Sequence, residues 1–292
     1  MEGWSLIVGH LQAGLLAAVF LLLLGVERVA PLRRSTRRAL PRFFVNFSFM
    51  ALAFIAGSFA VRPVSLWLAD QTSQKSFGLL SVLGLPAGVH GAAGFLLMDL
   101  TFYYWHRLNH TVPLLWRFHN VHHVDPDLDV TTSFRFHFGE ILYSTGFRVV
   151  QVGLLGVSVV TYLVYEFFFQ AGTMFHHSNI MLPIRIERRL NKIIVTPRMH
   201  GIHHSIFKNE TNSNYGVIFR WWDVLHRSMR LNIPQASIDI GIAGYRKPHD
   251  NTLRNLLLLP FRTQRDYWRR EDGRPAESRE IEMKGRLTTL SE

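Results

Sequence analysis

The chain of 292 residues contains no cysteine. This absence excludes disulfides, zinc–thiolate sites, iron–sulfur clusters and the covalent attachment of c-type haem, because each of these needs a thiol. It does not fix the redox compartment, since a chain without thiols is compatible with an oxidising or a reducing one.

Two motifs of common enzyme classes are also missing. No His-Glu-x-x-His occurs, since Arg107 follows His106, and this excludes the helix of that class of zinc protease. No Gly-x-Gly-x-x-Gly follows a strand-like run, so the chain has no evident site for a flavin or nicotinamide dinucleotide. Electrons for any redox reaction therefore have to come from an external donor.

Charged residues are scarce in four long stretches. Hydrophobic residues make up 48% of the chain, and the apolar runs are Trp4–Val26, Phe43–Ala69, Phe77–Trp105 and Ile141–Gly172. Runs of about 18 or more apolar residues are typical of membrane-spanning helices. The first run lacks a basic segment before it and a cleavage site after it, so we interpret it as a retained span rather than a signal peptide. The sequence predicts an all-α fold, a multi-pass membrane helical bundle with a cytoplasmic, histidine-rich helical cap.

The net charge of +11 comes from basic residues that flank the apolar runs. We interpret them as cytoplasmic loops near anionic lipid rather than as a nucleic-acid surface. The loop Arg33–Arg42 then lies in the cytoplasm and the N-terminus lies outside. Two full spans need about 40 residues, more than 141–172 provides, so we expect a hairpin there that turns near Gly153–Gly156.

Three regions follow from this reading. Residues 1–105 are expected to form transmembrane spans. Residues 106–260 are expected to form the catalytic region, which includes the membrane hairpin at about 141–172. Residues 261–292 are expected to form a charged C-terminal tail, either an exposed helix or a frayed end.

Eight histidines fall into three short clusters, which we call boxes. They are His106-Arg-Leu-Asn-His110, His119-Asn-Val-His122-His123 and His200-Gly-Ile-His203-His204. On a helix, spacings of three and four residues place side chains on one face, one turn apart. Neutral imidazole is a good ligand for iron, zinc and copper, and eight ligands are too many for one ion. The boxes therefore predict two metal ions.

Other histidine-rich proteins fit this pattern less well. A metal transporter is expected to place its ligands near the middle of the bilayer, whereas the boxes lie at span ends and in polar loops. A bis-histidine haem protein needs only one pair of histidines for each haem. The remaining alternatives are an enzyme like the acyl-CoA desaturases, which also have three boxes, and a non-enzymatic membrane metal-binding or transport protein.

The residues around the boxes resemble the sterol desaturase / fatty acid hydroxylase superfamily between about residues 95 and 228. The resembling segments are Asp99-Leu-Thr-Phe-Tyr103-Tyr-Trp-His106-Arg107, Trp116-Arg-Phe-His119-Asn-Val-His122-His123, Arg135-Phe-His137-Phe-Gly-Glu140, Phe175-His-His177-Ser-Asn179, Thr196-Pro-Arg-Met-His200-Gly-Ile-His203-His204-Ser, Asn214-Tyr-Gly216 and Trp222-Asp223. Two positions depart from the family pattern. Phe138 stands where proline is usual, and Leu225-His226-Arg227-Ser228 replaces the usual Leu-Phe-Gly-Thr.

The resemblance implies a membrane-bound, non-haem di-iron enzyme that uses dioxygen to hydroxylate or desaturate a C–H bond of a lipid such as a sterol or fatty acyl chain. It implies two iron ions, with zinc as a possible substitute, and an electron-donor protein such as a cytochrome or ferredoxin, or a reduced pterin. The expected metal ligands are the eight box histidines and His177. His137 is expected to be either a ligand or a hydrogen-bond donor next to one. Asp99, Glu140 and Asp223 are expected either to accept the second N–H of a ligating imidazole or to form salt bridges with Arg107 or Arg135.

Overall fold

The computed structural model describes residues 2–280, with side chains from residue 9 onward. The described part is helical and contains only isolated β-bridges, which confirms the all-α prediction. In chain order the α-helices are α1 (Glu2–Val29), α2 (Ala39–Ala56), α3 (Arg62–Gln74), α4 (Leu79–Val82), α5 (Ala87–Thr111), α6 (Pro113–His123), α7 (Phe138–Leu155), α8 (Val159–His177), α9 (Ile184–Leu190), α10 (Pro197–His203), α11 (Lys208–Thr211), α12 (Trp221–Leu225) and α13 (Leu253–Leu258).

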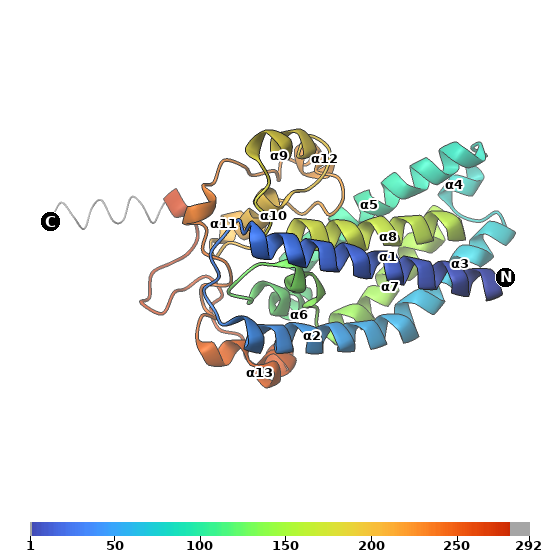
Figure 1. The fold of residues 1–292 in the computed structure, drawn as a ribbon. Helices are drawn as coiled ribbons and strands as arrows, with labels where there is room; N and C mark the ends of the chain where they lie inside the picture. Colours follow the sequence, from blue (N-terminus) through green and yellow to red (C-terminus); the bar gives the residue numbers. More distant parts are fainter. Residues whose placement is uncertain (1, 281–292) are drawn as a thin grey trace.

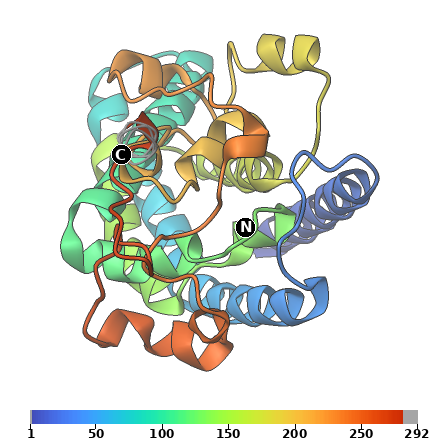
Figure 2. The ribbon, with the colours of Figure 1, turned by 90° about the vertical axis from the view of Figure 1, so that its left-hand side faces the viewer.

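The long helices form a bundle, and the short helices gather at one of its ends. Figure 1 shows α1, α2, α5, α7 and α8 running roughly along one direction, with α6 and α9–α13 at the end where α1 finishes. Viewed from that end, the long helices recede behind the short ones (Figure 2). The histidine boxes and His177 belong to the elements at this junction: the boxes to the end of α5, to α6 and to α10 with its C-cap, and His177 to the end of α8.

Among the described residues, two stretches are long and apolar enough to cross a membrane, Gly9–Val29 and Ala39–Val82. The second is longer than the run Phe43–Ala69 seen in the sequence, because α2 continues through a π-helical turn, Gly57–Val61, directly into α3. Many of its apolar side chains are exposed, among them Phe54 and Phe59. Exposed apolar surface of this kind is expected of helices that contact lipid.

The expectation that one apolar segment begins at Phe77 is wrong in its boundary. The chain first forms the short helix α4, and α5 begins only at Ala87. Gly84 has a positive φ of 58° and Pro86 occupies the N-cap of α5. A left-handed glycine followed by proline ends one helix and starts another, so these two residues interrupt the apolar run.

Helices α7 and α8 form an antiparallel hairpin that turns at Gly156. This glycine has a φ of 69°, a conformation that costs a residue with a side chain about 1–2 kcal/mol. A Cβ atom here would also collide with the carbonyl oxygen of Phe77. Ser158 then caps α8, because its hydroxyl accepts a hydrogen bond from the N–H of Thr161. The turn therefore lies inside the glycine-containing segment singled out in the sequence.

Not all arginines of the loop Arg33–Arg42 lie at the surface. Arg42 is inserted between Asp125 and Asp129, with Nε 2.7 Å from Asp125 Oδ1 and Nη1 paired with Asp129. The side chain of Arg33 donates to the carbonyl of Pro197. Arg42 therefore holds the start of α2 to the loop that follows the second box, which corrects the assignment of the whole loop to lipid.

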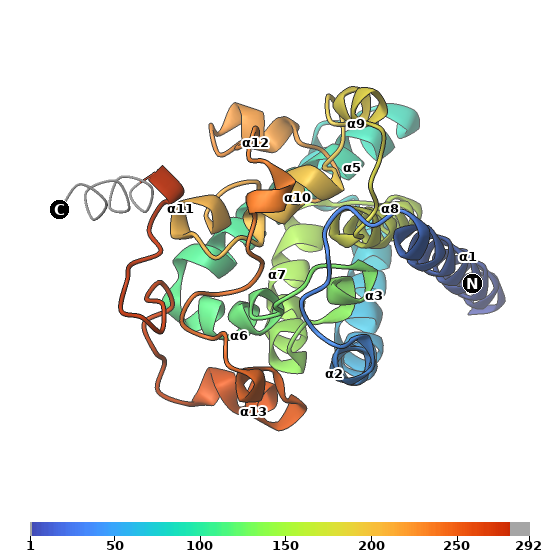
Figure 3. The same cartoon turned by 60° about the vertical axis from the view of Figure 1, so that its left-hand side comes forward.

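The described part of the C-terminal segment packs on the protein. Trp268 stacks on Trp116 with ring centroids 6.1 Å apart, and Ala276 is fully buried. Figure 3 shows this segment passing from α13 across the short-helix end. The expected free tail is therefore not seen up to residue 280, and residues 281–292 lie outside the described part.

Candidate metal centre

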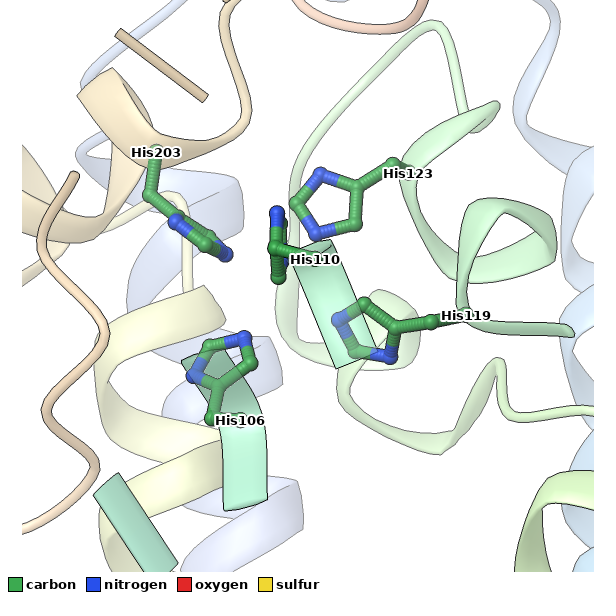
Figure 4. Close-up of side chains that lie close together, drawn as sticks. All are labelled: His106, His110, His119, His123 and His203. Atoms are coloured by element: carbon green, nitrogen blue, oxygen red, sulfur yellow. The ribbon is translucent and has the colours of Figure 1, made fainter. Parts of the chain in front are cut away.

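Nine histidines converge in two adjacent groups. The α5 group consists of His106, His110, His119, His123 and His203, and the α8 group consists of His122, His177, His200 and His204. Within each group, one ring nitrogen from every member lies within 4.8 Å of the others. Figure 4 shows the five rings of the α5 group turned toward a common centre. These nine are the eight box histidines together with His177.

The second and third boxes each contribute to both groups. In α6, His119 and His123 face the α5 group while His122 faces the α8 group. Residues one apart on a helix point about 100° apart, and residues four apart point in nearly the same direction. One helix therefore supplies imidazole rings to both groups. Helix α10 and its C-cap do the same with His203 on one side and His200 and His204 on the other.

Fixed acceptors hold four of these rings by Nδ1. His106, His177 and His203 donate to the backbone carbonyls of Tyr215, Thr173 and Ser213 at 2.8, 2.7 and 2.7 Å. His119 donates to Glu140 Oε1 at 2.9 Å. Such an acceptor fixes the tautomer and leaves Nε2 unprotonated and directed at the centre. These contacts are typical of rings that ligate a metal.

In the α8 group, the close contacts between ring nitrogens cannot all be hydrogen bonds between neutral imidazoles. Nε2 of His177 lies 2.9 Å from Nε2 of His122 and 3.0 Å from that of His200. Nε2 of His200 lies 3.1 Å from that of His204. Because Nδ1 of His177 carries the proton, its Nε2 holds a lone pair, and neutral rings cannot satisfy all three contacts with linear hydrogen bonds. One cation that accepts the lone pairs satisfies them together.

In the α5 group, the ring nitrogens are buried without partners. Nε2 of His119 and of His203, and both nitrogens of His110 and His123, form no hydrogen bond. A buried polar atom without a partner costs about 1–3 kcal/mol, so leaving several together is expensive. Nitrogen-only sets of this kind suit iron or zinc, and the residues present in both groups therefore fit two metal ions.

Burial keeps the imidazoles neutral. It lowers the pKa of His122, His123, His200, His203 and His204 well below the usual value, and the neighbouring histidines lower it further. Burial also lowers the pKa of His177 to about 3. Only the neutral ring offers a lone pair to a metal, so these groups are ready to bind one at neutral pH.

Of the three carboxylates considered in the sequence, one contacts a histidine of the two groups. Glu140 accepts from His119. Asp99 accepts from the backbone N–H groups of Ile218 and Phe219 and from Trp222 Nε1. Asp223 accepts from the N–H groups of Tyr215 and Gly216 and from the Ser228 hydroxyl. Asp99 and Asp223 therefore brace the 215–219 loop, and Asp223 holds the residue whose carbonyl fixes His106. Neither pairs with Arg107 or Arg135.

His137 lies outside both groups. Its Nδ1 accepts from the N–H of Gly139 and caps α7, and its Nε2 lies 3.2 Å from the carbonyl of Leu257. His176, which adjoins His177, lies next to the α8 group. It is buried, its ring centroid lies 4.0 Å from that of His200, and its Nδ1 is 3.1 Å from the carbonyl of Val217.

A cavity of about 540 Å³ connects the two groups with the long helices. Its lining includes His106 and His119 from the α5 group and His122, His177 and His200 from the α8 group. From there it extends between α1, α2, α7 and α8, where most of the lining is apolar. Arg148 and Glu166, two charged residues inside the last apolar run, also line it. The signal in the sequence that marks them is their charge within an otherwise apolar run.

Residues 91–228, which contain all nine histidines, match the sequence profile of the family described as fatty acid hydroxylase. Over this region the chain is similar to the fatty acid hydroxylase family. The match confirms the resemblance found from the boxes and their surrounding residues. The departure at Leu225–Ser228 has a structural role here, since the Ser228 hydroxyl bonds both Asp223 and the Tyr103 hydroxyl.

Curated relatives are similar to the chain over about half its length. Ornithine lipid hydroxylase OlsE of Rhizobium tropici is 32% identical over 162 residues, 54% of this chain and 47% of that protein. Human cholesterol 25-hydroxylase is 29% identical over 46% of this chain and 49% of its own. Human alkylglycerol monooxygenase is 25% identical over 45% and 28%. The matches thus span about half or less of these relatives. No solved structure matches the chain.

Proposed function

We propose that this protein is a membrane-bound, dioxygen-dependent di-iron oxidoreductase that hydroxylates a C–H bond of a lipid. The observation that carries the proposal is the pair of histidine groups at the end of an apolar cavity. The names of the relatives support lipid hydroxylation, since they act on an ornithine lipid, cholesterol and an alkylglycerol. Desaturation begins with the same removal of hydrogen and is the second candidate.

The chain supplies positions for the metals and the substrate. The α5 and α8 groups would hold the two irons, which when bound supply the activation of dioxygen. Glu140 and the carbonyls of Ser213 and Tyr215 fix the ligating rings. Phe102, Phe134 and Phe136 line the cavity next to the histidines, where they exclude water and pack against an apolar chain.

We place the histidine groups on the cytoplasmic side of a multi-pass membrane protein, with the α7–α8 hairpin as a re-entrant segment. A substrate then enters the cavity from the bilayer. Electrons come from an external partner, either a cytochrome or ferredoxin or a reduced pterin, because the sequence contains no dinucleotide motif.

Isotope labelling tests the reaction. Membranes that contain the protein, supplied with ¹⁸O-labelled dioxygen and a reducing system, should yield lipids with label in a new hydroxyl group. The His203→Ala variant, which lacks a ring of the α5 group, should yield none. An unsaturated product without label assigns the protein to desaturation, and lipid turnover that continues without dioxygen refutes both reactions.

A further inference from the structure

Two charged side chains form an ion pair in the part of the cavity that lies between the long helices. Nη2 of Arg148 on α7 lies 2.6 Å from Oε1 of Glu166 on α8. The guanidinium is buried among aromatic rings, with its central carbon 5.3 Å from the centre of Phe102 and 5.5 Å from that of Phe169. Charges inside a membrane segment are expensive, and they usually mark a functional site. A pair of apolar residues would hold the two helices together at lower cost.

The Glu166 carboxylate is accessible from the cavity. Its side chain keeps 23% of its surface exposed, whereas that of Arg148 keeps 6%. Arg148 also donates to Gln151 Oε1 at 2.6 Å, and Gln151 in turn donates to the carbonyl of Met98. The arginine is therefore fixed by the protein, and the carboxylate is the member of the pair that faces a ligand.

Gln170 lies one turn further along the same face of α8. It lines the cavity, is partly buried, and its amide forms no hydrogen bond with any described residue. Residues four apart on a helix are neighbours, so the free amide and the accessible carboxylate lie side by side. Together they offer one acceptor with charge and one donor, which is the complement of a hydroxyl group.

The spacing along α8 places this polar pair at a distance from the metal groups. Gln170 and Glu166 precede His177 by seven and eleven residues, which corresponds to about 10 and 16 Å along the helix axis. Thr173 and aromatic side chains such as Phe169 line the cavity between them and the histidines. A molecule that fills the cavity therefore meets polar groups at one place and the metal centre at another, with an apolar section between.

The charges of the lining favour a neutral group. The charged residues other than histidine that line the cavity within the described part are Arg62, Glu140, Arg148 and Glu166. Glu140 is engaged by His119 and Glu166 by Arg148, and Arg62 is exposed at the outer end. Because Arg148 and Glu166 together carry no net charge, an ammonium or carboxylate beside the pair would add an unbalanced charge in an apolar surrounding, which is costly, whereas a hydroxyl adds none.

We propose that Glu166 and Gln170 bind the free hydroxyl group of a neutral lipid alcohol and hold it about 10–16 Å from the carbon that is oxidised. This inference rests on the proposed function, because it takes the histidine groups as the place of oxidation. It adds the class of substrate. Glu166 accepts the hydrogen bond of the hydroxyl and Gln170 donates one to its oxygen. Arg148 is a positioning residue, because its ion pair holds the Glu166 carboxylate in place.

Binding without turnover tests the inference. The purified, metal-loaded full chain in detergent is mixed under argon with hexadecan-1-ol, hexadecane, hexadecylamine or hexadecanoic acid, and the bound lipid is measured by native mass spectrometry. The alcohol should bind about tenfold more tightly than the alkane, the effect of one hydrogen bond to a charged group, and more tightly than the amine or the acid. Equal binding of alcohol and alkane, or tighter binding of the amine, overturns the proposal.

Two variants and a control locate the effect. Gln170→Leu should lose most of the preference for the alcohol, while Gln74→Leu, the same change at an exposed position of α3, should keep it. Glu166→Gln leaves Arg148 without its counter-charge, so hexadecanoic acid should now bind at least tenfold better than to the wild type. If Gln170→Leu keeps the preference while its Tm is unchanged, or if Glu166→Gln does not gain binding of the acid, the pair is only structural and the proposal fails.

Failure of this inference and failure of the proposed function are distinguishable. When the same samples are given reductant and ¹⁸O-labelled dioxygen, label in bound alcohol supports both. An alcohol that binds selectively but is never labelled leaves the hydroxyl site intact and refutes the oxidation. Labelled products that do not depend on a hydroxyl in the lipid leave the oxidation intact and refute the site.

Discussion

Removal of the Glu140 carboxylate should weaken one metal site and spare the other. Glu140 Oε1 lies 2.9 Å from Nδ1 of His119, and His119 belongs to the α5 group alone. Loss of such an acceptor typically lowers metal affinity by 10–100-fold, which corresponds to about 1.4–2.7 kcal/mol. The Glu140→Ala variant, dialysed against a chelator that leaves the wild type loaded, should fall from about two metal ions per chain to about one.

The Glu140→Gln variant is the matched control. Its amide oxygen can still accept from His119, so most of the metal should be retained, with affinity closer to the wild type than in the alanine variant. Metal per chain is measured by inductively coupled plasma mass spectrometry on protein that remains monodisperse. If Glu140→Ala keeps both ions, or loses both at the same chelator concentration, the division of the nine histidines into two separately held centres is wrong.

Three further predictions concern the fold. Gly156→Ala should lower the Tm, because it loses more than the about 1–2 kcal/mol of its backbone conformation. Gly146→Ala is the control and should keep the Tm, because an added Cβ there meets no atom within 4 Å. Equal Tm values for the two variants would show that the turn is not strained. Arg42→Ala removes the arginine that pairs with the buried Asp125 and Asp129 and should cost about 3–5 kcal/mol. The exposed Arg38→Ala should stay within about 0.5 kcal/mol. An Arg42→Ala variant of unchanged stability would restore the lipid-facing assignment. Because the chain has no cysteine, single cysteines at the exposed Arg38 and Asn212 should both react with an impermeant reagent from the cytoplasmic side of sealed membranes, and labelling from opposite sides would contradict the proposed topology.

More features of the candidate metal centre than of the surrounding fold can be predicted from the sequence. The spacing of the boxes places their imidazoles on common helix faces, which depends only on helix periodicity. The number of histidines then exceeds what one ion needs, and this predicts two metal ions. Spacing shows that His122 and His123 point in different directions, but not that each meets a different group, since that depends on where α8 and α10 lie. His137 illustrates the same limit. Its motif is compatible with a ligand, but whether its nitrogens face a metal or cap a helix is decided by the direction of α7.

Long-range partners account for most of the other differences. Arg42 and Asp125 are 83 residues apart, so their pairing cannot be read from local pattern, and a loop rich in arginine looks like a lipid-facing one. The start of α5 was in principle readable, because Gly84 and Pro86 are ordinary helix boundaries. Apolar residues lie on both sides of Gly84 and Pro86, and this composition led to the prediction of one continuous segment. Composition indicates which segments avoid water, whereas glycine and proline residues mark where each helix begins.

Helix α8 carries Glu166, Gln170 and the metal-group residue His177 on one rigid element. The distance between its polar side chains and its histidine is therefore fixed in increments of one helical turn, about 5.4 Å, and does not depend on the movement of any loop. The helix sets this spacing. Transfer of the polar side chains by one turn would move the oxidised position along the substrate by the same increment. In this protein, substitutions on a single helix face would then change the regiochemistry while the histidine groups stay unchanged.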